Sequence, residues 1–277
     1  GLAEKKAKGY IAPFMAIEAM EKGLSYDIEA DIEREVELFS HCAISDIAKN
    51  LIGIFLNSRS AGRLPCTKGI TPLMINKVAV LGGGVMGSGI VNPLLKEGFE
   101  VMLWDINDAA IEKGVASVCE TFAYPIKKKK MTPADLDDLI KNKLTTTTAL
   151  KDLKDVDLVI EAILEDMKIK MDIWKQLDVI CQPVAIFATN TSALPITDIA
   201  KSLTDPGRMI GMHFFNPADR MQLLEVICAE KTSNLTLATS VAFCRNIKKI
   251  PVVVNDGPGF YVSRQLGGLF GGSVYLV

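Results

Sequence analysis

The pattern of apolar and polar residues changes character near residue 77. Before that point, residues 28–39 and 44–58 carry apolar side chains at helical spacing with charged residues between them. Residues 58–73 show no clear period and contain two prolines and two glycines. Such a composition is typical of a linker or an extended strap. The first part of the chain is therefore predicted to be a set of helices followed by a tether.

From residue 77 onward, short apolar runs alternate with helical patterns. The runs read as buried strands, at residues 78–81, 101–104, 156–160 and 184–189. Helices are expected through about residue 96, over 107–124, from a cap at Thr132, and on to Leu177. Residues 144–150 are expected to form an edge strand. This alternation predicts an α/β fold of the Rossmann type, a doubly wound and mostly parallel sheet with helices on both faces.

The first of these strands leads into three glycines, Gly82, Gly84 and Gly87, in GxGxxG spacing. In such a turn the first glycine allows a tight bend, the second lets the backbone approach a pyrophosphate, and the third lets the helix pack on its strand. The next strand ends at Asp105, whose carboxylate can accept hydrogen bonds from ribose hydroxyls and repels a 2′-phosphate. The stretch predicts a dinucleotide site that takes NAD in preference to NADP.

Residues 78–95 carry no charge, so a membrane span is the alternative interpretation of this stretch. Its five glycines, together with Asn92 and Pro93, make a poor lipid-facing helix, and we expect no membrane span.

Charge and cysteine content exclude several other classes. The 31 basic and 33 acidic residues give a net charge of −2, which offers no surface to nucleic acid or anionic lipid. The six cysteines lack CxxC or zinc-finger spacing, so we expect no metal site and reduced thiols of an intracellular, cytoplasmic protein. The first residues are polar and show no signal peptide. Because the chain looks cut from a longer one, an organelle matrix also stays open.

A second informative stretch spans residues 209–227. An apolar strand delivers His213, and a second apolar strand carries Glu225. A histidine at a strand end of a nucleotide-binding fold can act as a general base. Because an unpaired carboxylate in an apolar strand is costly, Glu225 is expected to pair with His213, fixing its tautomer and stabilising the imidazolium. The alternative is that Glu225 points into solvent. The only other histidine, His41, is expected at the surface.

Five segments in this order and spacing resemble the L-3-hydroxyacyl-CoA dehydrogenase family, and within it the dehydrogenase part of the multifunctional fatty-acid β-oxidation proteins. They are GGGVMGSGI, EAILEDMKIK, ATNTSALPI, GMHFFNPADRMQLLEVI and VVVNDGPGFYVSR. Residues 1–60 resemble, less sharply, the end of the enoyl-CoA hydratase part and its linker helix. The body of that hydratase is not in this chain, so the resemblance implies no hydratase activity.

The resemblance also implies roles for single residues. The catalytic histidine falls on His213 and its paired glutamate on Glu225, while Ser192 and Asn216 lie by the substrate oxygen and the nicotinamide. The implied NAD contacts are Gly82, Gly84, Met86, Gly87, Asp105, Ile163, Leu164, Glu165 and Lys170, with Ser192 and Asn216. The implied reaction oxidises the 3-hydroxyl of an (S)-3-hydroxyacyl-CoA to a ketone: His213 takes the hydroxyl proton while C3 gives its hydride to nicotinamide C4.

Two departures from the family pattern stand out. The family carries an asparagine that approaches the substrate where this chain has Ser263, and we expect a loss of about 1–2 kcal/mol from that exchange. The chain also ends at Val277, where the family's helical C-terminal region begins. We therefore expect an incomplete acyl-CoA cleft and an apolar end, residues 267–277, without its packing partner. The implied partners are an acyl-CoA substrate, a thiolase subunit, and a second copy bound through the missing region.

The expected organisation has three parts. Residues 1–75 form the end of the hydratase-like part and the linker helix, residues 76–255 the NAD-binding Rossmann domain, and residues 256–277 the start of an all-helical C-terminal domain. Three alternatives remain open. One is a β-hydroxyacid dehydrogenase of the 3-hydroxyisobutyrate type, which relies on a catalytic lysine. The others are a non-catalytic NAD-binding relative with a structural or sensing role, and a fragment that binds NAD but turns over poorly.

Overall fold

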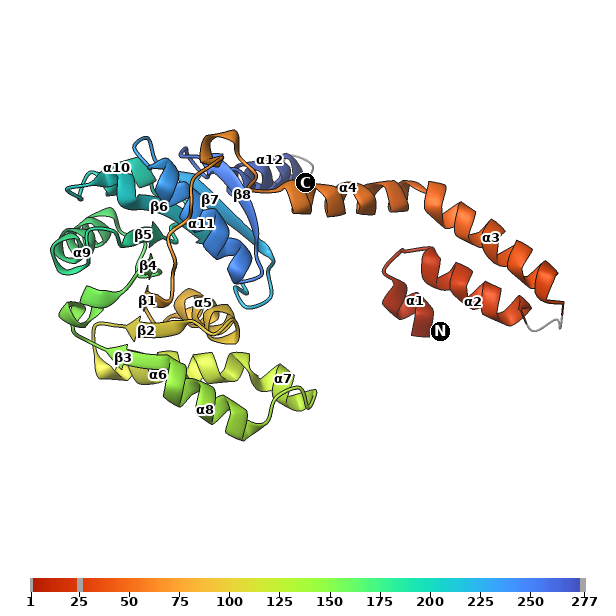
Figure 1. The fold of residues 1–277 in the computed structure, drawn as a ribbon, viewed down its shortest axis with the longest axis horizontal. Coiled ribbons are helices and arrows are strands. Elements are labelled where there is room, and N and C mark those ends of the chain that lie inside the picture. The colour runs from red at the N-terminus through yellow and green to blue at the C-terminus, as the bar shows by residue number, and fades with distance from the viewer. Residues whose placement is uncertain (1, 24–26, 275–277) are drawn as a thin grey trace. The chain divides into compact units, whose positions relative to one another are not determined.

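The computed structural model describes residues 2–23 and 27–274, and the chain divides into two compact units, residues 1–61 and 62–277. The first unit is helical (Figure 1): α1 Leu2–Ala7, α2 Ala12–Lys22, α3 Ile28–Ile44 and α4 Asp46–Ser60. Asp27 caps α3 by accepting the N–H of Ala30, and Ser45 caps α4 by accepting the N–H of Ala48. Helices α3 and α4 confirm the helical pattern predicted for this part of the chain.

The second unit is built on an eight-stranded sheet. Its strands are β1 Lys77–Leu81, β2 Glu100–Trp104, β3 Leu144–Thr147, β4 Leu158–Glu161, β5 Ile186–Thr189, β6 Met209–Phe214, β7 Leu223–Cys228 and β8 Ile250–Asn255. Their order is β3-β2-β1-β4-β5-β6-β7-β8, and every neighbouring pair is parallel except β6 and β7. The doubly wound, mostly parallel sheet is confirmed, with β3 as an edge strand.

Helices cover both faces of this sheet (Figure 1). Their bounds are α5 Val85–Lys96, α6 Asp108–Thr121, α7 Ala123–Lys127, α8 Pro133–Lys143, α9 Met167–Ile180, α10 Ile196–Ala200, α11 Asn234–Asn246 and α12 Val262–Val274, with short 3₁₀ turns at Pro65–Thr67, Leu150–Asp155 and Pro206–Arg208. One apolar core joins the sheet to α5, α6, α8 and α11. The other joins it to α9, α10 and the turn Leu150–Asp155.

The helix predicted over residues 107–124 is interrupted, because α6 ends at Thr121 and α7 starts at Ala123. Phe122 between them is completely buried, so its ring anchors the junction in the core. The cap predicted at Thr132 is present as a capping box with Asp135, in which each side chain accepts the other residue's backbone N–H.

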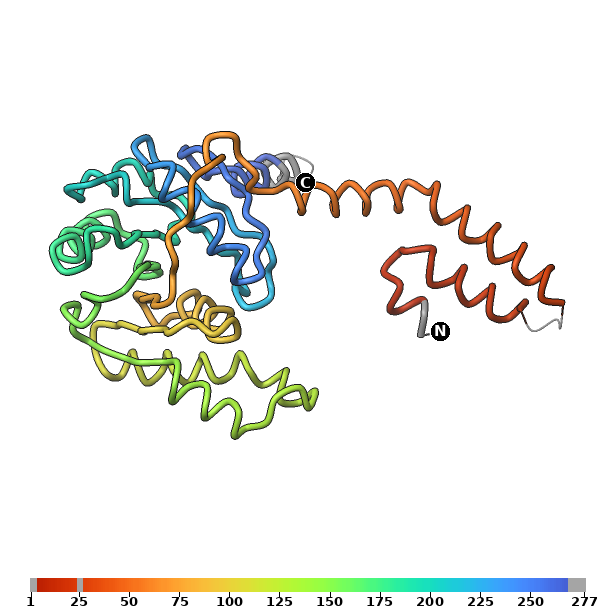
Figure 2. The backbone as a smooth tube through the Cα atoms, in the orientation of Figure 1, coloured from red at the N-terminus to blue at the C-terminus, as the bar shows by residue number. Residues whose placement is uncertain are grey.

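An extended strap, residues 62–76, leads to β1, and Figure 2 follows it along the second unit. The backbone N–H of Leu73 donates to the hydroxyl of Thr239 on α11 at 3.0 Å. At the end of the strap, the N–H groups of Asn76 and Lys77 donate to Asp157 Oδ2 at 2.8 and 2.9 Å. The strap has no helix or sheet partner for these N–H groups, so side chains of the second unit accept them instead.

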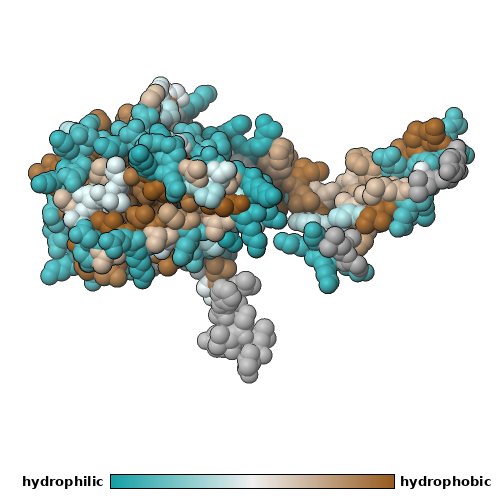
Figure 3. Space-filling model, turned by 90° about the horizontal axis from the view of Figure 1, so that it is seen from below, coloured by the Kyte–Doolittle hydropathy of each residue, from teal (hydrophilic) through white to brown (hydrophobic). Residues whose placement is uncertain are grey.

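Apolar side chains are exposed on the first unit, as the brown areas of its helices show (Figure 3). On α3, Ile28, Ile32, Val36 and Phe39 are between 54% and 74% exposed. Among the described residues, no helix combines the length and the apolar character needed to cross a membrane. The prediction that the apolar end, residues 267–277, lacks a packing partner falls on side chains outside the described residues, since no side chain from residue 269 onward is described.

Candidate active site

The glycine turn after β1 has the geometry that a bound dinucleotide requires. Gly82 adopts a φ of +97°, which favours glycine, and a Cβ on Gly87 would lie 1.7 Å from the carbonyl oxygen of Gly82. A Cβ on Gly84 would meet no protein atom within 4 Å. Any need for glycine there would therefore come from the close approach of a ligand and not from packing within the protein. No side chain among the described residues caps α5, which leaves its first N–H groups available to a phosphate.

Asp105 lies directly against this turn. Its Oδ2 accepts the backbone N–H of Gly83 at 2.7 Å, and its Oδ1 accepts the backbone N–H of Ile106 at 2.7 Å. The carboxylate is thereby held at the carboxyl end of β2, and each oxygen keeps a further lone pair for a ribose hydroxyl. Met86, also predicted to contact the cofactor, is half-buried in the first turn of α5 and packs against the core beneath.

The segment after β4 joins Lys170 in a buried ionic cluster. Lys170 Nζ lies 2.5 Å from Glu161 Oε1 and 3.2 Å from Glu165 Oε2. Ile163 is half-buried, and Leu164 is 74% exposed. Glu161 was missed by the sequence analysis, although the signal was the same as at Glu225: an acidic residue in an otherwise apolar strand.

Glu165 connects this cluster to the turn after β5. Its Oε1 accepts the hydroxyl of Thr191 and, at 3.1 Å, the backbone N–H of Ser192. Burial raises the pKa of the Glu165 carboxyl, but the hydrogen bond from Thr191 and the charge of Lys170 outweigh it, so the pKa is lowered. Glu165 is therefore ionised at neutral pH and fixes the position of Ser192.

His213 and Glu225 face each other directly across the antiparallel pair β6 and β7. His213 Nδ1 lies 2.7 Å from Glu225 Oε2, and both side chains are buried. Glu225 Oε1 accepts the backbone N–H groups of Tyr261 at 3.0 Å and Val262 at 2.9 Å, at the start of α12. Burial raises the pKa of Glu225, but the hydrogen bonds from His213 and Val262 oppose this effect and outweigh it, so the pKa is lowered. Glu225 is therefore an anion whose two oxygens accept hydrogen bonds from His213, Tyr261 and Val262.

The remaining predicted residues lie on the elements next to this pair. Ser192 and Asn216 are exposed in the turns after the adjacent parallel strands β5 and β6. The two turns are joined because Asn190 Oδ1 accepts the backbone N–H of Phe214 at 2.8 Å. Ser263 is half-buried in the first turn of α12, next to the backbone that binds Glu225. No contact between Ser192 and Asn216 is seen among the described residues. His41, as predicted, is exposed, on α3.

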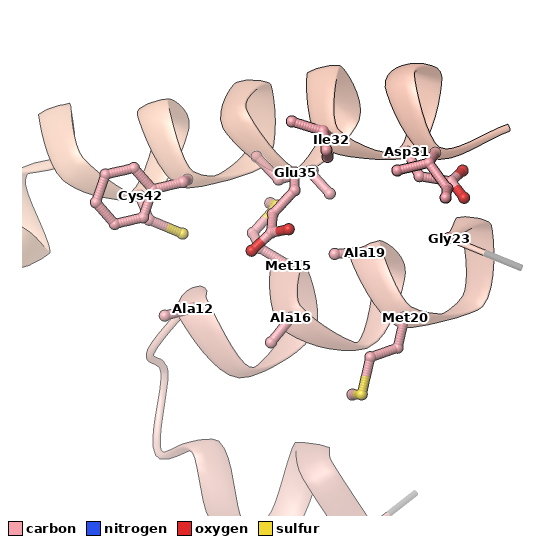
Figure 4. A pocket seen from close by; sticks show the side chains of 13 residues that line it. Ala12, Met15, Ala16, Ala19, Met20, Gly23, Asp31, Ile32, Glu35 and Cys42 are labelled. Atoms are coloured by element: carbon pink, nitrogen blue, oxygen red, sulfur yellow. The ribbon is translucent and has the colours of Figure 1, made fainter.

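The first unit contains a groove of its own, between α2 and α3 (Figure 4). Its lining is mostly methyl, thioether and other apolar groups, with the carboxylates of Asp31 and Glu35 as its charged groups. Its lining also includes the thiol of Cys42, and none of the residues predicted to bind NAD or to catalyse the reaction lies there.

Comparison with known proteins agrees with this geometry. The family described as 3-hydroxyacyl-CoA dehydrogenase, NAD binding domain, matches residues 77–257. The fatty acid oxidation complex subunit alpha of Shewanella sp. (strain W3-18-1) is 38% identical over 265 residues, covering 95% of this chain and 37% of that protein. The chain thus spans little more than a third of the length of this curated relative.

Two solved structures also resemble the second unit. The (S)-3-hydroxybutyryl-CoA dehydrogenase of Ralstonia eutropha superposes with a TM-score of 0.68 at 40% identity, covering 71% of this chain and 69% of that one. The dehydrogenase part of multifunctional enzyme 1 from C. elegans gives a TM-score of 0.60 at 33% identity, covering 66% of this chain and 42% of that one.

Proposed function

The chain belongs to the 3-hydroxyacyl-CoA dehydrogenase family, and on that premise we propose that it reversibly oxidises the 3-hydroxyl group of an (S)-3-hydroxyacyl-CoA in fatty-acid oxidation. The cofactor of this domain family is NAD. The observation that carries the proposal is the buried 2.7 Å hydrogen bond between His213 Nδ1 and Glu225. A non-catalytic NAD-binding relative has no use for a general base held in this way, and the β-hydroxyacid dehydrogenases of the rival group rely on a lysine instead.

The residues of the glycine turn fit the cofactor. In this proposal the uncapped N-terminus of α5 and the open space above Gly84 receive the pyrophosphate, and Asp105 receives the adenosine ribose. Met86, together with Ile163, Leu164 and Glu165, borders the rest of the cofactor. The side chain of Lys170 is 1% exposed, so it supports the site by pairing with Glu165. NAD, when bound, supplies the acceptor for the hydride that leaves C3 of the substrate.

His213 and Glu225 divide the proton transfer between them. Because Nδ1–H is donated to Glu225, the lone pair of Nε2 is free to take the proton of the 3-hydroxyl. The ionised carboxylate then stabilises the imidazolium that forms. Ser192 and Asn216, exposed at the neighbouring strand ends, orient the reacting oxygen and stabilise its developing negative charge.

The proposal extends to the longer protein that the relatives represent. Residues 1–75 correspond to the end of a hydratase-like part and its linker helix, residues 76–255 to the dehydrogenase domain, and residues 256–277 to the start of a helical domain that completes the acyl-CoA cleft. A thiolase subunit and a second copy of the chain are the proposed partners. An intracellular location is supported by the six cysteines, all of which are free thiols.

The proposal is tested by mixing this chain with NADH and acetoacetyl-CoA. We expect NADH fluorescence to report binding and NADH absorbance to fall as acetoacetyl-CoA is reduced. NADPH is the matched control, expected to bind at least about tenfold more weakly, a factor equal to about 1.4 kcal/mol of repulsion from Asp105. Binding without turnover would favour the non-catalytic alternative or a fragment with an incomplete cleft. Absence of binding would contradict the proposed dinucleotide site.

Ser263→Asn is expected to raise kcat/KM for acetoacetyl-CoA about 5- to 30-fold, the factor that corresponds to 1–2 kcal/mol. The longer amide side chain would restore a direct hydrogen bond to the substrate from the first turn of α12. The affinity for NADH serves as the control and should not change, because Ser263 follows Val262, whose backbone N–H binds Glu225, whereas the glycine turn binds Asp105. Identical kinetic constants for the variant and the wild type would refute this role.

A further inference from the structure

Glu161, the last residue of β4, is fully buried and accepts three hydrogen bonds. Its Oε1 accepts Lys170 Nζ at 2.5 Å and the backbone N–H of Ile163 at 2.9 Å, and its Oε2 accepts the hydroxyl of Thr189 at 2.7 Å. One carboxylate thereby ties together the ends of β4 and β5, the first turn of α9, and the segment that follows β4.

The cluster has a buried half and an exposed half. The side chains of Glu161 and Lys170 are 0% and 1% exposed, whereas that of Glu165 is 42% exposed. Glu165 and Ser192 are therefore accessible to a ligand, while Glu161 and Lys170 are buried. The cluster also borders the dinucleotide turn, since a Cβ on Gly82 would lie 2.7 Å from the carbonyl oxygen of Ala162.

The charges explain why a carboxylate is needed at the buried end. Lys170 lies between two carboxylates, and the shorter contact is to Glu161. If Glu161 were neutral, Glu165 would be the remaining counter-charge in the cluster, and the buried ammonium would be drawn toward it. Glu165 would then be pulled away from Thr191 and from the N–H of Ser192, which it now holds in place.

We propose that Glu161 is a positioning residue for the nicotinamide half of the cofactor, acting through Lys170 on Glu165 and Ser192. The inference rests on the proposed function, which assigns Glu165 and Ser192 to that half. The glycine turn and Asp105 are assigned instead to the pyrophosphate and the adenosine, so the proposed role of Glu161 concerns the other half of the cofactor. The two halves of the cofactor can therefore be tested independently with ligands that contain one half or both.

The experiment compares the affinities of Glu161→Gln for NADH and for ADP, which lacks the nicotinamide half. Glutamine keeps the size of the side chain and removes its charge. We expect NADH to bind about tenfold more weakly, equal to about 1.4 kcal/mol, with ADP affinity unchanged. Glu230→Gln, which removes the same charge from an exposed glutamate, should change neither affinity. An equal loss of NADH and ADP affinity, or no loss at all, would overturn the inference.

A double-mutant cycle then tests the route through Lys170. If Glu161 acts through Lys170, the variant that combines Glu161→Gln with Lys170→Met should bind NADH no more weakly than Lys170→Met alone. Additive losses would overturn that route. A failure of Lys170→Met to weaken NADH binding would also overturn that route, whereas a wild-type chain that binds no NADH would contradict the proposed cofactor site itself. If Glu161→Gln does not fold, Thr189→Val removes only the hydroxyl bonded to Oε2, and it should cause a smaller loss of NADH affinity with the same selectivity.

Discussion

Replacing His213 by glutamine is expected to lower kcat for acetoacetyl-CoA reduction about 100- to 10,000-fold, the range that a positioned general acid or base contributes. The imidazole is held at Nδ1 by Glu225, which leaves Nε2 as the atom that exchanges the proton with the substrate. Glutamine fills a similar space and can still donate an amide hydrogen to Glu225, so the variant should keep the fold while losing the proton transfer.

Steady-state kinetics and NADH fluorescence separate these two effects. The dissociation constant for NADH should stay within about twofold of the wild-type value, a difference of about 0.4 kcal/mol, because His213 lies apart from the glycine turn. His41→Gln is the matched control, since it makes the same exchange at an exposed histidine of the first unit and should retain full activity. A His213→Gln variant that kept more than a tenth of the wild-type activity would mean that another group transfers the proton.

The fold could be predicted largely because its information is local. Strands β1, β2, β4 and β5 are short, mostly apolar runs, and the turn and helix of each follow directly in sequence. The antiparallel direction of β7 was not predicted, although residues 215–222 are too few for the crossover that parallel strands need. The break after α6 was missed because helical spacing continues across Phe122, and only tertiary packing of its buried ring shows where the helix ends.

The candidate site was predictable in its residues more than in its connections. The pairing of Glu225 with His213 follows from the cost of a lone carboxylate in an apolar strand. The same argument applies to Glu161, but its partner Lys170 lies on a helix whose rotation relative to β4 is set by core packing. The contacts of Glu225 with Tyr261 and Val262 join segments more than thirty residues apart, which no local pattern could reveal.

Those contacts give Glu225→Gln a specific expected result, a loss of activity comparable to that of His213→Gln, about 100- to 10,000-fold. The N–H groups of Tyr261 and Val262 need an oxygen acceptor, so they fix the amide with its oxygen toward α12 and its NH₂ toward His213. That NH₂ donates to Nδ1, which places the imidazole proton on Nε2 and removes the lone pair that the base needs. A wild-type kcat in the Glu225→Gln variant would show that the tautomer of His213 does not limit the reaction.

The same substitution should destabilise the protein in a way that depends on pH. Because the pKa of Glu225 is lowered in the folded state, its stabilising effect is fully present above the ordinary value of 4.5 and is lost as the pH falls through the folded-state pKa. Glutamine resembles the protonated form, so the melting temperature of Glu225→Gln should lie below that of the wild type at pH 7 and approach it in acid. A difference that stayed constant from neutral pH to well below 4.5 would mean that the ionised carboxylate does not hold the start of α12 against β7.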